Sequence, residues 1–174
     1  MRKIIGFAAA MVLVAGVAFA SVRPSELNGV ITAPKPYGTA SLTWLFLTAY
    51  DASLWTDAPQ WSMNERFALT IAYKMSFTRQ ELVESTIEEM QKVAPGLSRE
   101  TAAQYAASLA KAYPNVKSGD RITALHEPGK PVRFFHNGTM TSQVEDPSFA
   151  DPFFGIWLSP KTSEPSVRAG LLGL

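Results

Sequence analysis

The chain has 174 residues, of which 47% are hydrophobic and 18% are charged, as is typical of a folded globular protein. It contains no cysteine, which excludes disulfides, thiolate nucleophiles and sulfur-ligated metals. Its formal net charge is +1, and it has no cluster of Lys and Arg of the kind that contacts phosphate backbones. Composition therefore predicts a globular protein that is stabilised by its core alone and has no nucleic-acid partner.

The first twenty residues have the three parts of a secretory signal. Arg2 and Lys3 supply the positive start, residues 4–19 form an apolar run, and Ala18-Phe19-Ala20 places small residues where a signal peptidase reads them. The apolar run is shorter than the roughly 20 residues that span a bilayer. We therefore expect residues 1–20 to be a cleaved signal peptide, the protein to be periplasmic or secreted, and no permanent membrane anchor to remain after cleavage.

The first part of the remaining chain favours irregular structure followed by two long strands. Residues 21–36 are rich in Pro and Gly and predict an irregular lead-in with a short strand at 30–32. Residues 42–55 form a continuous β-prone run with apolar residues at both parities, which predicts one central strand covered on both faces. Residues 66–76 alternate, with Phe67 and Tyr73 on one face and Lys74 on the other.

The second part predicts two helices, three short strands and two more helices. Thr78-x-x-Glu81 is a capping box that starts a helix to about Val93, and Ser98 caps a second helix to about Ala112. Strands are expected at 120–127, 131–136 and 140–144, with Asn137-Gly138 as the last hairpin turn, and helices from Asp146-Pro147 and from Ser163. This order predicts an α+β fold in which helices cover one face of an antiparallel sheet.

No catalytic or metal site is evident from the residues themselves. His126 and His136 fall on neighbouring strands but out of register for a shared metal ion, and neither a Gly-x-Ser-x-Gly elbow nor a phosphate-binding glycine loop is present. We therefore predict no catalytic residues, no metal and no cofactor. Lys74 leaves two alternatives open, because it needs an anionic partner if helices cover its face and is a solvated lysine if they do not.

Four segments in order resemble the bacterial branch of the chalcone isomerase-like family. They are Gly-Thr-Ala-Ser-Leu-Thr-Trp-Leu-Phe-Leu-Thr-Ala-Tyr-Asp-Ala-Ser-Leu-Trp at 38–55, Gly-Asp-Arg-Ile-Thr at 119–123, Phe-Phe-His-Asn-Gly at 134–138 and Phe-Phe-Gly-Ile-Trp-Leu at 153–158. The resemblance implies that residues 37–174 form a chalcone isomerase-like open-faced sandwich, a large antiparallel β-sheet with a layer of α-helices on one face.

The resemblance also implies that most catalytic groups of the plant enzymes have been replaced. It matches one catalytic lysine with Lys74, the catalytic tyrosine with Leu82, the second lysine with Ser85 and the catalytic threonine with Tyr50. The catalytic arginine has no counterpart, because residues 24–65 contain no arginine. A non-catalytic branch of the family binds fatty acids between sheet and helices, and it carries a tyrosine where this chain has Tyr50.

Three hypotheses follow. The leading one is an exported, non-catalytic protein that holds a small apolar or amphipathic, fatty-acid-like ligand, with Tyr50 and Lys74 as polar contacts and Trp44, Phe67 and Tyr73 as walls. It requires the helices to cover the side of the sheet that carries Lys74. The second is an isomerase or intramolecular lyase on an unknown substrate, with Lys74 and Tyr50 as acid–base groups. The third is a protein-interaction module without a ligand pocket, which exposed clusters of aromatic residues would favour.

Overall fold

A computed structural model describes residues 22–174, so the predicted signal peptide at 1–20 lies outside the described residues. The described chain forms one six-stranded sheet in which every strand pairs antiparallel with its neighbours in sequence order. The strands are β1 (Gly38–Trp44), β2 (Leu47–Thr56), β3 (Phe67–Tyr73), β4 (Arg121–His126), β5 (Val132–His136) and β6 (Thr139–Val144). The predicted α+β class and large antiparallel sheet are thereby confirmed.

The helices are η1 (Ser25–Leu27, a 3-10 turn), α1 (Arg79–Val93), α2 (Arg99–Ala112), α3 (Ala150–Leu158) and α4 (Pro165–Leu172). Helix α1 begins where predicted because the Thr78 side chain accepts from the Glu81 amide while the Glu81 carboxylate accepts from the Thr78 amide. Helix α3 begins at Ala150 rather than at Pro147, because the Asp146 carboxylate accepts from the Ser148 amide and holds residues 146–148 in a turn.

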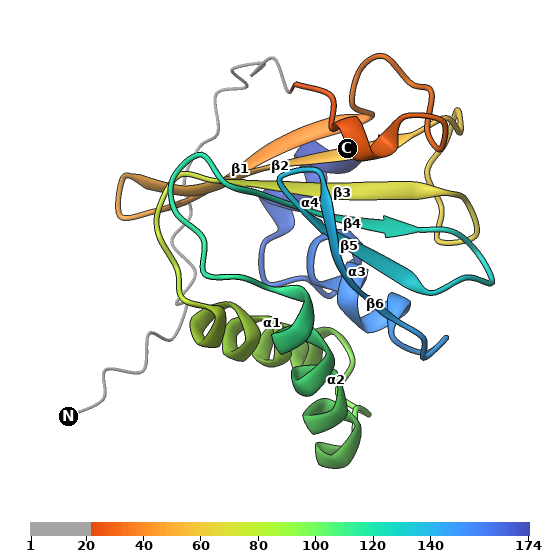
Figure 1. The fold of residues 1–174 in the computed structure, drawn as a ribbon. Coiled ribbons are helices and arrows are strands. Elements are labelled where there is room, and N and C mark those ends of the chain that lie inside the picture. Colours follow the sequence, from red (N-terminus) through yellow and green to blue (C-terminus); the bar gives the residue numbers. More distant parts are fainter. Residues whose placement is uncertain (1–21) are drawn as a thin grey trace.

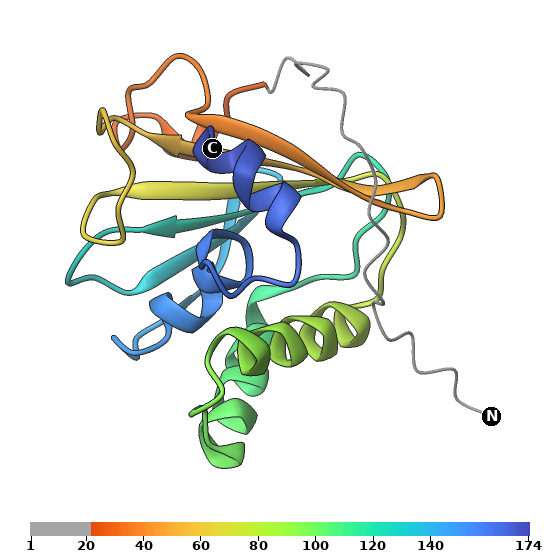
Figure 2. The same cartoon turned by 180° about the vertical axis from the view of Figure 1, so that it is seen from behind.

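The helical layer covers one face of the sheet. Figure 2 shows α3 and α4 in front of the strands and α1 and α2 below them. The odd-numbered residues of β3 lie under this layer, and all of them are buried in the main core: Phe67, Leu69, Ile71 and Tyr73. Helix α4 packs directly on this face of β1, since the Gly38 backbone lies so close to Leu171 that a side chain would not fit between them.

The opposite face is covered by the lead-in rather than by helices α1–α4. Leu27 and Ile31 are fully buried there in a second, smaller core with Trp55 and Phe135. Figure 1 shows this segment in front of the strands at the upper right. The strand predicted at 30–32 is wrong: the Asp57 carboxylate accepts from the backbone amides of Thr32 and Ala33 and holds the segment in an irregular conformation.

The single strand predicted at 42–55 is also wrong. The chain reverses at Leu45 and Phe46, so that β1 and β2 form a hairpin in which Trp44 pairs with Leu47. Both turn residues have positive φ, 46° for Leu45 and 69° for Phe46, as a two-residue turn of type I′ requires. Such backbone costs about 1–2 kcal/mol per non-glycine residue, and nothing in the sequence of the run marks it as a turn.

The hairpin predicted at Asn137-Gly138 is present between β5 and β6, with φ of 49° and 90°. Within residues 22–174, no helix is long and apolar enough to cross a bilayer.

Candidate functional site

Three tyrosines meet between the sheet and the helices, and we call them the tyrosine cluster: Tyr50, Tyr73 and Tyr113. Tyr50 on β2 and Tyr73 on β3 are direct partners across the ladder, and their rings meet edge to face with centroids 6.4 Å apart. Tyr113 enters from the C-terminal end of α2. Tyr73 and Tyr113 are buried and Tyr50 is partly buried.

The three phenol hydroxyls differ in their hydrogen bonding. The Tyr50 oxygen accepts a 2.9 Å hydrogen bond from Nε1 of Trp157 on α3, and the Tyr113 oxygen lies 3.4 Å from the hydroxyl of Thr86 on α1. The Tyr73 hydroxyl has no hydrogen-bond partner among residues 22–174. Tyr73 is therefore a largely buried side chain, 7% exposed, whose hydroxyl is not tied to the described part of the protein.

The electrostatic environment keeps these phenols protonated. Burial away from water raises the pKa of Tyr50, Tyr73 and Tyr113 above the ordinary value for tyrosine. The neighbouring Tyr113 and Tyr50 raise the pKa of Tyr73 further. At neutral pH the cluster can donate hydrogen bonds, but it supplies no phenolate to act as a base.

Two carboxylates give one side of the cluster a negative potential. Burial raises the pKa of Glu164, and the nearby charge of Glu89 raises it further. Both carboxylates also raise the pKa of Tyr50. Lys92 binds Glu89 at 2.5 Å, so one of the two charges has a cationic partner. An anionic ligand group on this side would meet repulsion, whereas a neutral hydrogen-bond acceptor would not.

Lys74 does not belong to this site. Alternation along β3 directs it to the face opposite Tyr73, where its ammonium lies 2.9 Å from the Asp51 carboxylate and its side chain is 46% exposed. The expectation that helices cover the lysine-bearing side is therefore wrong, because they cover the face with the large apolar residues. Burying that face removes far more apolar surface from water than burying one made of Ala, Thr and Lys.

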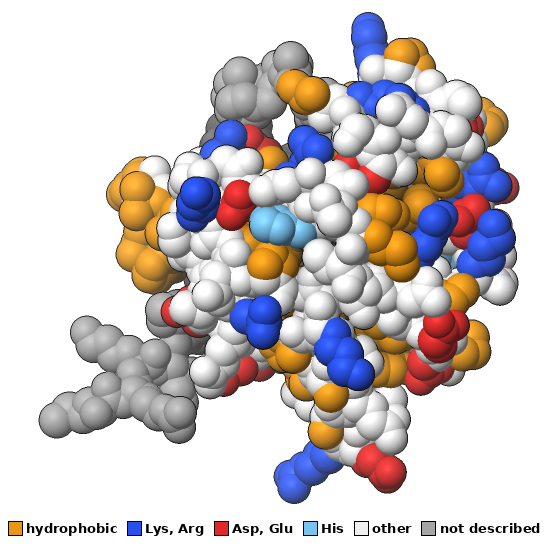
Figure 3. All heavy atoms as spheres, in the orientation of Figure 1, with side chains coloured by type: hydrophobic (Ala, Val, Ile, Leu, Met, Phe, Trp, Pro, Cys, Tyr) orange, Lys and Arg blue, Asp and Glu red, His pale blue; other side chains and the backbone are white. Residues whose placement is uncertain are grey.

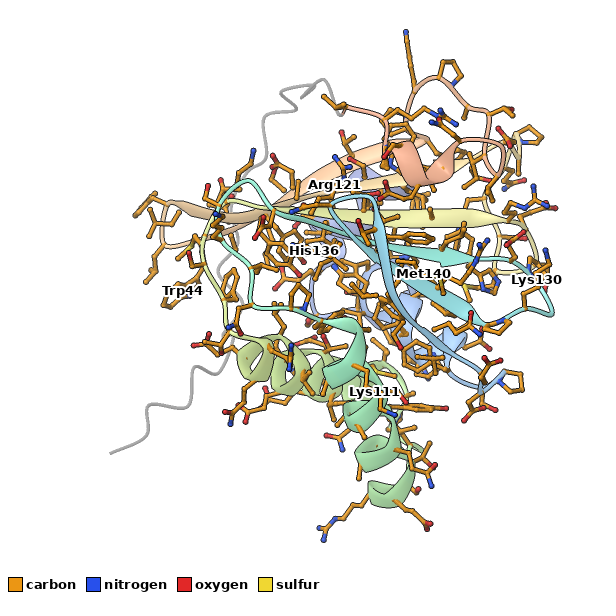
Figure 4. The ribbon with its side chains drawn as sticks, in the orientation of Figure 1. Trp44, Lys111, Arg121, Lys130, His136 and Met140 are labelled. Carbon is orange, nitrogen blue, oxygen red and sulfur yellow. The ribbon has the colours of Figure 1, made fainter. Side chains whose placement is uncertain are left out.

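The structure separates the remaining predicted wall residues. Tyr73 is central, but Phe67 lies six residues away along β3, roughly 20 Å, where its ring packs against Phe154 and His126. Trp44 lies at the tip of the β1–β2 hairpin, at the left of Figure 4. Its side chain is 37% exposed. Of the five predicted ligand contacts, the fold thus brings together only Tyr50 and Tyr73.

Comparison with known proteins identifies the fold and the family. The sequence model described as chalcone isomerase-like matches residues 37–173. The chain belongs to the chalcone isomerase-like family. Among solved structures, this chalcone isomerase-like chain resembles the fatty-acid binding protein AtFAP1 of Arabidopsis thaliana, with a TM-score of 0.58 and 10% identity over 82% of this chain and 89% of the other. No curated protein sequence matches it significantly.

Two of the positions that the resemblance aligns with catalytic groups, Leu82 and Ser85, lack the tyrosine and the lysine of the plant enzymes. Leu82 and Ser85 lie on α1, and Leu82 packs against the main core. Metal-binding groups are also lacking in the described part of the chain, since no three His, Asp or Glu side chains converge. His126 instead bonds the Met63 carbonyl, and His136 lies 3.8 Å from Asp120.

The two best-formed surface hollows lie away from the tyrosine cluster. One of about 410 Å³ lies at the α1–α2 turn and is lined by Leu97, Tyr105 and Asp146. The other, of about 380 Å³, lies between Asp57 and Lys130. Both are open to solvent, unlike the enclosed pockets that hold small apolar ligands.

Reasoning from the sequence missed Tyr113, Trp157 and the Glu89–Glu164 pair. Trp157 was within a recognised motif, but helix periodicity alone does not say which strand a helix residue reaches. The signal that was available concerns β3: its odd residues are large and apolar and its even residues small, which favours helices on the odd face.

Proposed function

We propose that this protein is an exported, non-catalytic binding protein for a small apolar or amphipathic molecule, held at the tyrosine cluster between the sheet and the helices. The export part of the proposal rests on the signal-like composition of residues 1–20. The binding part rests on one observation, the Tyr73 hydroxyl, which makes no hydrogen bond to any residue in 22–174 although its side chain is largely buried at the cluster.

A hydroxyl that makes no hydrogen bond within the described residues is available to donate one to a ligand. The Tyr73 ring lies beside the aromatic rings of Tyr50 and Phe77, with centroids 6.4 Å and 5.9 Å from its own. A ligand that brings one oxygen acceptor and an apolar body would satisfy the hydroxyl and contact the rings. Such a combination of apolar walls and few polar groups is typical of lipid-binding sites.

The charges around the cluster favour a ligand with a neutral polar end. No Arg or Lys side chain bonds any of the three phenol hydroxyls within residues 22–174, and Glu89 and Glu164 lie on the Tyr50 side. An ionised carboxylate would lack a cationic partner there. We therefore infer an ester, a carbonyl or a protonated acid as the group that accepts from Tyr73.

A catalytic role is less well supported by the same contacts. A general base or acid works best with a pKa near the working pH, whereas burial moves the pKa of the three phenols further from neutrality. Lys74, the second candidate acid–base group, is on the other face of the sheet and paired with Asp51. The Lys74→Met substitution should accordingly leave ligand binding unchanged.

Binding of a dansyl-labelled undecanoic acid and of its methyl ester, followed by fluorescence titration, tests this proposal. We expect the neutral ester to bind more tightly than the acid at neutral pH. Tyr73→Phe removes only the donor and should weaken ester binding about 5-fold, the worth of one hydrogen bond of about 1 kcal/mol.

Tyr105→Phe is the matched control, because Tyr105 is equally buried but its hydroxyl donates to Asp146 at 3.1 Å, away from the cluster. It should leave ester binding unaltered. Binding of both probes with no effect of Tyr73→Phe, or no binding of either, would contradict the proposed site. Native mass spectrometry of protein recovered from the exported fraction should show a neutral lipid-sized adduct.

A further inference from the structure

The tip of the β1–β2 hairpin exposes four consecutive large apolar side chains, and we call it the apolar tip: Trp44, Leu45, Phe46 and Leu47. Their exposed fractions are 37%, 61%, 96% and 57%. Among residues 22–174 only Val22, Met140 and Leu174 are other large hydrophobic residues with comparable exposure, and these are scattered. Figure 3 shows the hydrophobic atoms gathered at the left edge, where Figure 4 labels Trp44.

The fold does not need these side chains at the tip. Phe46 is almost fully exposed, so its side chain adds little packing to the described part of the chain, yet it and Leu45 occupy positive-φ positions that Asn and Gly adopt with less strain. Strain that the core does not require commonly marks a functional segment. The tip also lacks the charged residues that usually protect an exposed hairpin, since residues 38–50 contain no Asp, Glu, Lys or Arg.

We propose that the apolar tip docks the protein onto a lipid bilayer surface by inserting these four side chains among the lipid headgroups and upper acyl chains. A protein partner fits less well, because specific protein interfaces bury about 800 Å² on each side and a two-residue turn with its flanking pair offers only a few hundred. Bilayer binding has no such minimum area, because its strength grows with each apolar group buried. Trp and Phe are also favoured at membrane interfaces.

Two exposed lysines lie beside the apolar tip, and each has a carboxylate nearby: Asp51 pairs with Lys74, and Asp120 lies near Lys117. Lys74 lies next to the hairpin, since its backbone amide donates to the Ala49 carbonyl, and its side chain is 46% exposed. Lys117 is exposed in the loop beside it, where the Gly119 amide donates to the Tyr73 carbonyl. Lysines near an inserted apolar segment strengthen its attraction to anionic headgroups.

Membrane docking does not depend on the proposed ligand site, although the two lie close together. Leu42 on β1 pairs with Tyr50 on β2, so the tyrosine cluster is at the same end of the sheet as the apolar tip. A docked protein would therefore hold the cluster near the bilayer, a source of apolar molecules. Either proposal can fail while the other stands, because each has its own substitutions and measurements.

Co-sedimentation with vesicles of phosphatidylethanolamine and phosphatidylglycerol tests the docking. The processed protein, with its N-terminus verified by mass spectrometry, should sediment with the vesicles, and brominated lipids should quench its fluorescence. Trp44→Phe should lose most of that quenching, because Trp44 is the one tryptophan within the apolar tip and Trp157, the one at the tyrosine cluster, lies between sheet and helices. Vesicles of phosphatidylcholine alone should bind several-fold less.

The double substitution Leu45→Asn/Phe46→Gly is the sharpest variant, because it removes the apolar side chains and relieves the turn. It should lower vesicle binding about ten-fold or more while raising Tm by a few degrees. Met140→Ser, which removes an exposed apolar side chain on β6, is the control and should bind like the wild type. The proposal is overturned if the wild type does not bind vesicles, if the double variant binds equally well, or if size-exclusion chromatography shows that the variant only breaks a dimer.

Discussion

The two tight hairpins of this sheet have the same backbone geometry and opposite chemistry. The β5–β6 turn uses Asn137 and Gly138, and the β1–β2 turn uses Leu45 and Phe46, with positive φ at all four positions. The first turn is anchored, since the Asn137 side chain accepts from the Arg121 amide and donates to Asp120. The second turn makes no side-chain hydrogen bonds at its two central residues within the described chain and exposes both to solvent.

This contrast shows that apolar side chains on a hairpin can serve two different purposes. In β5 the apolar residues face the core, and the turn residues are chosen for backbone conformation. In the β1–β2 turn, Leu45 and Phe46 adopt a positive φ that neither residue favours, and both side chains are exposed outside the core. The residues of the apolar tip are therefore explained by something outside the fold, for which a bilayer surface is our proposal.

The largest expected effect is a difference in stability between two substitutions, one of a phenylalanine in each hairpin. Phe134 on β5 is fully buried, and its ring packs against those of Tyr113, Phe149 and Phe153. Phe134→Ala should lower the free energy of unfolding by about 3–5 kcal/mol through the cavity that it leaves. Phe46→Ala should change it by no more than about 0.5 kcal/mol. Urea denaturation of both variants measures the difference, and similar losses would contradict the distinction.

The next effect concerns the glycine of the anchored turn. Gly138 has φ of 90°, and a Cβ added there would lie 3.0 Å from Oγ of Ser25 in the lead-in. Gly138→Ala should therefore destabilise the protein by about 2 kcal/mol, combining the conformational cost with the close contact. Gly129→Ala is its control, because Gly129 also has positive φ but open space around it. Thermal denaturation should show the larger loss for Gly138→Ala; equal losses would mean that the lead-in simply shifts away.

Giving the β1–β2 turn the residues of the anchored β5–β6 turn should raise the stability of the protein and not lower it. Leu45→Asn/Phe46→Gly gives the β1–β2 hairpin the residues that a type I′ turn favours. We expect the free energy of unfolding to rise by about 1–2 kcal/mol, because less strain is stored in the folded backbone. Guanidinium denaturation of the variant beside the wild type measures this, and a loss of stability would show that the exposed side chains do support the fold.

The smallest expected effect is a pH dependence confined to the anchored turn. Hydrogen bonds from Asn137 and from the Lys117 amide lower the pKa of Asp120 below its ordinary value of 3.8. A carboxyl whose pKa is lower in the folded state contributes stability above its unfolded pKa and loses it as the pH falls through the folded pKa. Asp120→Asn should thus cost less than about 1 kcal/mol at neutral pH, and the difference from wild type should shrink in acid.

Amide hydrogen exchange gives the local readout of the same effect. As the pH falls through the lowered pKa of Asp120, the amides of the turn at Asn137 should lose protection beyond the intrinsic pH dependence of exchange, while those of the turn at Phe46 should not. A uniform change at both turns would indicate global loosening instead.

Local patterns in the sequence predicted several elements correctly because their signals act within a few residues. The Thr78–Glu81 capping box set the start of α1, and Asn137-Gly138 placed the β5–β6 turn. The turn at Leu45-Phe46 could not be predicted in this way, since neither residue favours positive φ. The stretch at 30–32 is held by Asp57, more than twenty residues away, and carries no local sign of its conformation.

The candidate site was predicted only in part for a related reason. Alternation along β3 correctly separates Tyr73 from Lys74, and the larger apolar residues on the Tyr73 face favour helices there, but the match of Lys74 with a catalytic lysine pointed to the other face. Tyr113 and Trp157 reach the cluster from α2 and α3, so their roles depend on how those helices pack. Family resemblance pointed to Tyr50 and could not indicate that Lys74 lies on the far side.

The sequence by itself determined the antiparallel order of the meander, the starts of the first two helices and the family, since each depends on short-range propensity or on matched motifs. Only the tertiary structure decided that the chain turns at Leu45-Phe46, that the helices cover the Tyr73 face, and that the lead-in covers the other. Those choices depend on how much apolar surface each packing arrangement buries, which is a property of the assembled sheet and not of any one segment.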